Sequence, residues 1–208
     1  MDYDFELVIM TCGERGTPHR AVISAANPGL TIHVWSGEET GLDGWRNCDR
    51  NMREFWRAKR AEVAAQKVLF IEYDVFANVA LGPLMPALQK GCGIVCAAVK
   101  SPVRDGRSWF PFQETNRLPA ELQSVVIGTA PMAVLLCDRA ALDAVLDAKW
   151  DAVFEADVFC EIRLGTIMRS EGFSVVECSA WRGVGTRPMV PPGGASGIYH
   201  PVKMEVQS

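Results

Sequence analysis

Two hydrophobic patterns alternate along the chain: short apolar runs of five or six residues, and longer charged segments with apolar residues at helical spacing. The short runs predict buried strands, and the longer segments predict amphipathic helices. The expected strands are 6–11, 31–36, 68–72, 93–98, 124–128, 132–137 and 174–177. The expected helices are 17–26, 49–66, a short one after Pro83 ending near Lys90, 138–150 and 157–171. Helical crossovers between successive strands favour parallel pairing, so we expect an α/β fold with a mixed, mostly parallel sheet flanked by helices.

Polar residues at the starts of the helical segments are predicted to cap them. Thr17 precedes a proline at a first helical position, and Asp49, Asp138 and Asp157 stand where N-cap acids are favoured. Gly172 is a helix stop.

Two segments do not fit regular elements. Residues 100–118 contain Trp109, Phe110 and Phe112, which either pack as a lid or offer a surface to a ring-bearing ligand. Residues 183–197 are rich in glycine and proline and are expected to form a mobile loop.

Composition narrows the class of protein. The chain has 208 residues, 49% of them hydrophobic, and a net charge of −4, which gives no reason to expect a nucleic acid partner. We see no secretory signal and no transmembrane segment, and so expect a cytoplasmic protein. Seven scattered cysteines suit free thiols in a reducing compartment, and their spacing disfavours a structural zinc site.

The strongest chemical candidate lies at the end of the predicted strand 68–72. Glu72 and Asp74 are two positions apart, so along an extended chain their carboxylates point to the same face. The carboxyl ends of strands are where open α/β sheets place ligands. The alternative is that Glu72 ends the strand and Asp74 begins a turn.

Several familiar motifs are missing. The sequence has neither a phosphate-binding Gly-x-x-x-x-Gly-Lys loop nor Gly-x-Gly-x-x-Gly after the first strand, and it lacks Gly-x-Ser-x-Gly. P-loop nucleotidases, Rossmann dehydrogenases and nucleophilic hydrolases are therefore disfavoured.

The alternating α/β elements, the acid-x-acid turn after the third strand, the acid near the start of the late helix and the His-x-x-Lys after the glycine-rich loop together resemble the nucleotide-diphospho-sugar transferases of the GT-A fold. Glu72-Tyr73-Asp74 is similar to their Asp-x-Asp motif, with Glu as a departure at the first position, and Tyr199-His200-Pro201-Val202-Lys203 is similar to a carboxyl-terminal segment of several GT-A families. The resemblance implies that Asp74 and His200 bind a divalent cation, Mn²⁺ or Mg²⁺. It also implies that Glu72 contacts the nucleoside and Lys203 the diphosphate.

The resemblance also implies a catalytic base near the late helix. Asp157 matches the family's position, followed by Arg163-Leu164, and Glu161 lies one turn further on the same face and competes for the role. Asp157 as a simple N-cap is the open alternative.

Thr11, Gly13 and Arg15 stand where the family holds the nucleotide. The resemblance then implies a single GT-A-like domain over 1–208, with a nucleotide-sugar-binding half at 1–98, an acceptor-side half at 99–182 and a mobile loop and tail at 183–208.

Two functions remain open. The first is a metal-dependent glycosyltransferase that moves a sugar from a nucleotide-diphospho-sugar donor to an unknown acceptor. The second is a non-catalytic GT-A-like module that binds a nucleotide or a protein. The oligomeric state, including a homodimer, is left open.

Overall fold

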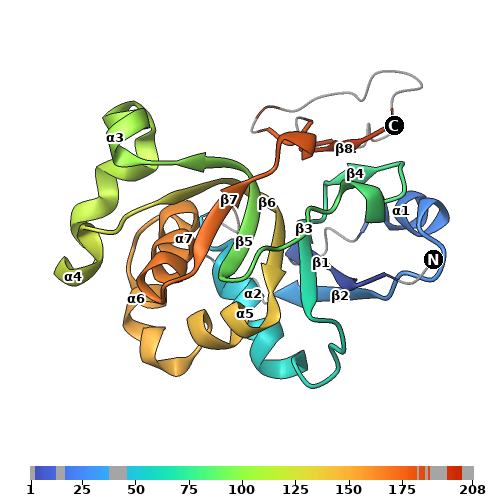
Figure 1. Ribbon diagram of the computed structural model, residues 1–208, viewed down its shortest axis with the longest axis horizontal. Helices are drawn as coiled ribbons and strands as arrows, with labels where there is room; N and C mark the ends of the chain where they lie inside the picture. Colours follow the sequence, from blue (N-terminus) through green and yellow to red (C-terminus); the bar gives the residue numbers. More distant parts are fainter. Residues whose placement is uncertain are drawn as a thin grey trace.

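The protein is organised around a six-stranded sheet (Figure 1), described in a computed structural model. The structure describes residues 3–12, 17–37, 46–181, 183–185, 187 and 196–202. The sheet order is β2-β1-β3-β6-β5-β7, and a separate pair joins β4 to β8. The strands are β1 (Phe5–Cys12), β2 (Ile32–Gly37), β3 (Lys67–Glu72), β4 (Phe76–Ala77), β5 (Cys92–Lys100), β6 (Gly128–Asp138), β7 (Ser174–Glu177) and β8 (Ile198–Tyr199).

Parallel pairing dominates the sheet, as predicted. β1 is parallel to β2 and to β3, and β5 is parallel to β7, while β6 runs antiparallel between β3 and β5. The expected α/β fold with a mixed, mostly parallel sheet is therefore confirmed.

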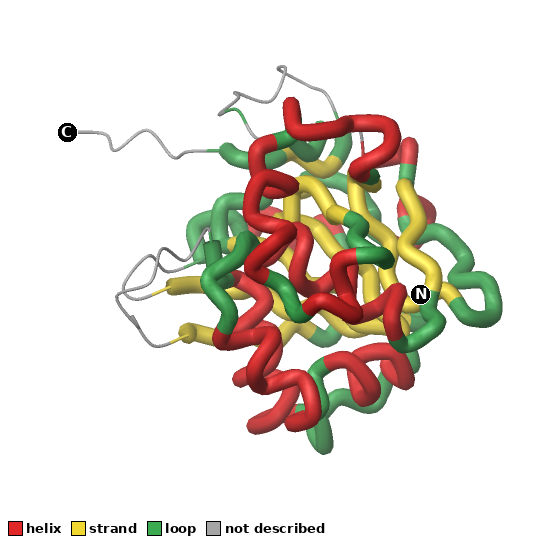
Figure 2. The backbone as a smooth tube through the Cα atoms, turned by 90° about the vertical axis from the view of Figure 1, so that its left-hand side faces the viewer, coloured by secondary structure: helices red, strands yellow, loops and turns green. Residues whose placement is uncertain are grey.

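Both faces of the sheet are covered, which explains the continuous apolar run of β3. Val68 and Phe70 point into one core, which they share with helices α2 (Cys48–Lys59), α5 (Arg139–Val145) and α7 (Cys160–Ser170). Leu69 and Ile71 point into a second core with α1 (Arg20–Ala26) and the segments around Trp181. A strand buried on both faces needs no polar alternation. Figure 2 shows the helices gathered in front of the strands on one side.

The region 124–137 differs from the prediction of two strands. Residues 124–127 form a turn and coil after the helical residues 120–123, so the strand predicted at 124–128 is wrong, and a single long strand, β6, runs from Gly128 to Asp138. Pro131 suggested a break because proline donates no ladder hydrogen bond. The register with β5 shifts between Cys96 and Ala98, and Pro131 falls in this gap, where no ladder bond is required.

The helices are shorter than the sequence pattern predicted. Their bounds are α1 (Arg20–Ala26), α2 (Cys48–Lys59), α3 (Pro102–Asp105), α4 (Ala120–Gln123), α5 (Arg139–Val145), α6 (Asp151–Glu155) and α7 (Cys160–Ser170). Single 3₁₀ segments are Gly82–Leu84, Gly106–Ser108, Phe110–Arg117, Ala148–Trp150 and Ser179–Trp181.

Tertiary hydrogen bonds explain two of the early ends. Helix α2 was expected to reach residue 66, but the Glu6 carboxylate accepts the N–H groups of Ala64 and Ala65, at 2.7 and 2.9 Å. Helix α5 was expected to reach residue 150, but the carbonyls of Leu146 and Asp147 accept from Arg53.

Two further helix predictions are wrong: one helix begins later than predicted, and the other is reduced to a single 3₁₀ turn. Residues 17–19 form a turn, so α1 begins at Arg20 without a side-chain cap from Thr17. The helix predicted to end near Lys90 is only the 3₁₀ turn Gly82–Leu84, and the carbonyl of Leu84 accepts from the Trp181 indole.

The predicted N-caps have mixed outcomes. Asp138 caps α5 by accepting the N–H of Ala141, as predicted. Asp49 lies inside the first turn of α2, where it pairs with Arg163, and both side chains are fully buried. Asp157 does not cap α7, which begins at Cys160, because the Glu114 carboxylate accepts the N–H of Phe159 instead.

The aromatic segment 100–118 is folded into short helical turns. Trp109 packs against Gly128 and lies edge-on to the buried Phe112 with ring centroids 4.6 Å apart. Phe110 remains 45% exposed. The packed interpretation therefore holds for two of the three rings.

The six cysteines whose side chains are described are buried and free, as expected. In the described part of the chain no helix has the length and apolar character needed to cross a membrane.

Candidate functional site

The carboxyl end of β3 carries the two predicted acids. β3 ends at Glu72, and a turn closed by the Val75 N–H and the Glu72 carbonyl, 3.0 Å apart, leads into β4. The Asp74 side chain is buried and the Glu72 side chain is half-buried. A buried carboxylate is costly unless it is paired or binds a cation, so this turn needs a positive partner.

The third predicted residue, His200, reaches this turn from the far end of the chain. β8 pairs antiparallel with β4, and His200 forms a bridge with Val184, so residues 196–202 lie over the end of β3 (Figure 1). We call residues 196–202 the tail segment. The His200 Nε2 lies 3.1 Å from Glu72 Oε2 and 3.3 Å from Asp74 Oδ1.

The hydrogen bonding of the His200 ring fixes which nitrogen faces the acids. Its Nδ1 lies 2.9 Å from the carbonyl oxygen of Gly185, which can only accept, so Nδ1 carries a hydrogen. Metal-binding histidines commonly donate their second ring nitrogen to a carbonyl in this way. Nε2 is thereby directed towards Glu72 and Asp74.

The residues fit a divalent cation. Their ligand atoms all lie within 4.8 Å of one another. Ligands at about 2.1 Å in octahedral geometry are separated by roughly 3.0 Å, close to the distances between Nε2 and the two acids. Two carboxylates and one imidazole form a donor set suited to Mn²⁺.

The electrostatics of the same group also favour a cation. Burial alone would lower the pKa of His200, but the hydrogen bonds to Asp74 and Glu72 raise it to about 9. The cluster thus attracts a positive charge, which a proton on His200 or a metal ion can supply.

Glu161 lies in the first turn of α7 and is buried. Burial raises the pKa of Glu161 to about 7, and the nearby charge of Glu72 acts in the same direction. The Cys160 thiol lies 3.4 Å from Glu161 Oε2, and burial raises the pKa of that thiol well above its usual value, so the thiol stays protonated and donates. A carboxyl group that titrates near neutral pH is suited to proton transfer.

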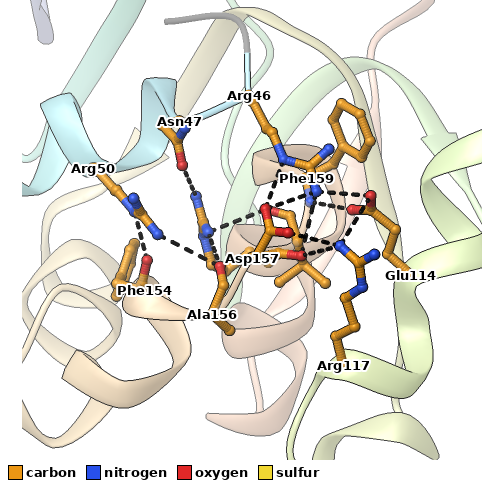
Figure 3. Close-up of polar contacts among 11 residues, drawn as sticks. Arg46, Asn47, Arg50, Glu114, Arg117, Phe154, Ala156, Asp157 and Phe159 are labelled. Carbon is orange, nitrogen blue, oxygen red and sulfur yellow. Dashed lines mark hydrogen bonds and ion pairs between the residues drawn. The ribbon is translucent and has the colours of Figure 1, made fainter. Parts of the chain in front are cut away.

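Asp157 is placed differently (Figure 3). Its side chain is 77% exposed and sits between Arg46 and Arg117, with carboxylate oxygens 3.0 and 2.8 Å from the two guanidinium groups. Arg46 also pairs with Glu114 and stacks over the Phe159 ring, 4.1 Å from its centroid. This network ties the start of α7 to the segments around residues 46 and 114.

The remaining predicted nucleotide contacts are only partly described. Thr11 lies at the end of β1 and is buried, and within the described part of the chain its hydroxyl has no hydrogen-bond partner. An unmet buried hydroxyl at this edge of the sheet is a suitable contact for a polar ligand. Gly13, Arg15 and Lys203, and most of the predicted mobile loop, lie outside the described residues.

Sequence reasoning did not find the surroundings of Glu161. Cys48 and Cys160 have sulfur atoms 3.4 Å apart, although they are separated by 112 residues in the chain. No spacing in the sequence indicates such a contact, because it depends on how α2 and α7 pack.

Comparisons with known proteins give a fold likeness. No protein-family model matches the chain, and no curated protein matches it by sequence. The similar solved structures are GT-A glycosyltransferases. The galactosyltransferase LgtC with donor and acceptor sugar analogues has 13% identity over 83% of this chain and 72% of its own, with a TM-score of 0.47.

Two further structures are similar over comparable lengths. Mouse xyloside xylosyltransferase 1 has 14% identity over 96% of this chain and 97% of its own, with a TM-score of 0.42. Glucosyl-3-phosphoglycerate synthase from Mycobacterium tuberculosis, in complex with Mn²⁺, UDP and phosphoglyceric acid, has 17% identity over 83% and 67%, with a TM-score of 0.43. Sequence identities and TM-scores at this level carry no conclusion about the substrate or activity of this chain.

Proposed function

We propose that this protein is a metal-dependent glycosyltransferase that takes a sugar from a nucleotide-diphospho-sugar donor. The observation that carries the proposal is the convergence of Glu72, Asp74 and His200 at the carboxyl end of β3. These residues come from two segments far apart in sequence, and their atoms have the spacing of metal ligands.

In the proposal all three residues hold the cation, Mn²⁺ or Mg²⁺. Asp74 and His200 are the ligands that the resemblance implies, and Glu72 joins them from the same turn instead of contacting the nucleoside. When bound, the cation neutralises negative charge that develops on the departing nucleotide diphosphate. Lys203, Gly13 and Arg15 are proposed to contact the phosphates, and Thr11 the nucleoside.

Glu161 is the favoured base for an inverting transfer. A base must be partly ionised at working pH, and a carboxyl group with a pKa of about 7 meets that requirement. Its carboxylate would accept the proton of the acceptor hydroxyl as that oxygen bonds to the sugar carbon and the bond to the diphosphate breaks. Asp157 is the weaker candidate, because both of its oxygens already accept from arginines.

Replacing Asp74 tests the metal role. In calorimetry, wild-type protein should bind UDP in the presence of Mn²⁺, and Asp74→Asn should lose this Mn²⁺-dependent binding while its circular dichroism is unchanged. Asp4→Asn is the matched control, since Asp4 pairs with Lys67 at the opposite end of β3. Unchanged Mn²⁺-dependent binding in Asp74→Asn would overturn the assignment.

A panel of nucleotide sugars with Mn²⁺ then tests catalysis. Glycosyltransferases commonly hydrolyse their donor slowly, so we expect release of the nucleotide diphosphate from at least one donor. Binding without release from any donor would instead favour a binding module.

A further inference from the structure

The tail segment has little regular structure to hold it in place. β8 contributes two residue pairs with β4, and the bridge to Val184 adds two backbone hydrogen bonds, from the His200 N–H to the Gly183 carbonyl at 3.2 Å and from the Gly185 N–H to the His200 carbonyl at 3.0 Å. A two-residue strand pair is weak by itself. These bonds tie His200 to residues 183–185, which also lie outside the six-stranded sheet, so the position of His200 over the two acids also depends on anchors at other points of the tail segment.

Val202 is anchored on both sides of its peptide backbone. Its N–H donates to the carbonyl of Asp74 at 2.9 Å, and its carbonyl lies 3.0 Å from the Nε2 of His19. Because a carbonyl only accepts, the His19 Nε2 is the donor. His19 is therefore the side chain that ties the end of the tail segment to the start of α1.

Packing holds the His19 ring in the orientation that this hydrogen bond requires. It is buried, and it packs edge-on against Phe76, the β4 residue that pairs with Tyr199, with ring centroids 5.5 Å apart. The hydrogen bond joins residues 183 positions apart in the chain. The buried His19 ring donates its Nε2 hydrogen to the Val202 carbonyl, and this hydrogen bond fixes the position of that carbonyl.

A displacement of Val202 would also move the His200 side chain away from the two acids. His200 lies two residues before Val202, and its Nε2 must stay near 3 Å from both acids for one ion to reach all three. A shift of about 1 Å would take the nitrogen out of bonding range of an ion held by Glu72 and Asp74.

We propose that His19 is a positioning residue for the metal site: its hydrogen bond to Val202 holds the tail segment so that His200 faces Glu72 and Asp74. This inference rests on the proposed function, because it gives His19 a role through the metal ligand His200. In this proposal His19 acts through Val202 and is not a ligand of the ion.

The test compares two substitutions at this position. His19→Leu removes the donor and keeps an apolar side chain against Phe76, whereas His19→Gln keeps an N–H group near the position of Nε2. We expect Mn²⁺ affinity, measured by electron paramagnetic resonance, to fall about tenfold or more in His19→Leu and to stay within about threefold of wild type in His19→Gln. His33→Leu is the control, since His33 pairs with Glu6 on β1 and should leave Mn²⁺ affinity unchanged.

Hydrogen exchange measured without metal tests whether the His19–Val202 hydrogen bond holds the tail segment, independently of any bound ion. In the presence of a chelator, amide exchange of residues 196–202 should be faster in His19→Leu than in wild type or His19→Gln. Wild-type exchange together with wild-type Mn²⁺ affinity in His19→Leu overturns the inference.

Failure of the wild-type protein to bind Mn²⁺ would overturn the proposed function and, with it, the role of His19 at a metal site. Faster exchange in His19→Leu would then still support the anchor, and unchanged exchange would overturn the anchor as well.

Discussion

Glu161 provides the sharpest link between the structure and a measurable property. Its pKa is raised from 4.5 to about 7, chiefly by burial. Between these values the folded protein keeps a proton that the unfolded chain has released, so stability falls as the pH rises through this range. Each pH unit is worth about 1.4 kcal/mol, so ionising this carboxyl in the folded state costs roughly 3 kcal/mol above pH 7.

Glu161→Gln removes the ionisation and keeps the shape of the side chain. We expect the variant to match wild type at pH 4.5, where both side chains are neutral, and to be more stable by roughly 3 kcal/mol at pH 8. In a chain of this size that corresponds to a rise of roughly 6–12 °C in the melting temperature.

Urea denaturation at several pH values, with a chelator present, measures this difference. The chelator matters because a cation held by Glu72 and its partners would lower the pKa of Glu161. Glu54→Gln, an exposed residue on α2, should show no pH-dependent difference from wild type. A stability difference between Glu161→Gln and wild type that is the same at pH 4.5 and pH 8 would refute the reasoning.

Two further predictions concern the tail segment and the base. Gly183→Ala should weaken Mn²⁺ binding at least tenfold in calorimetry, because the added Cβ would lie 2.3 Å from the Ile198 carbonyl oxygen and displace the tail segment. Gly185→Ala is the control: its Cβ would lie 4.0 Å from the nearest atom, the His200 carbonyl oxygen, so its Mn²⁺ affinity should equal that of wild type. Equal affinity in both variants would contradict the packing argument. Asp157→Asn should cost less than about 1 kcal/mol and leave donor turnover within about threefold, whereas Glu161→Gln should lower turnover by about 100-fold or more. The reverse order would make Asp157 the base.

The sheet was largely predictable because its strands are short apolar runs that need burial on both faces. β3 shows this most clearly, with Val68 to Ile71 dividing between two cores. β6 was misjudged because Pro131 looks like a break when its neighbours are unknown. The shifted register of β5 removes the hydrogen bond that Pro131 could not make.

The helix ends were less predictable because distant side chains decide them. Glu6 accepts the backbone N–H groups just beyond α2, and Glu114 accepts the N–H of Phe159 where Asp157 was expected to cap. Local propensity contains no information about such partners.

The candidate metal site was predictable to the extent that it follows from strand ends. Glu72 and Asp74 stand where β3 leaves the sheet, which the apolar run predicts, whereas the approach of His200 to them was expected only from the resemblance to GT-A families. The hydrogen bond between His19 and Val202 had no signal in the sequence, because it arises from the path of the tail segment in space.

Diffraction from crystals grown with Mn²⁺ and UDP, recorded with anomalous scattering at the manganese edge, tests the central claim most directly. We predict one manganese peak at the end of β3, with bonds of about 2.1 Å to both Asp74 and His200. Bound UDP without a manganese peak at these two residues, or a peak elsewhere in the molecule, would contradict the account.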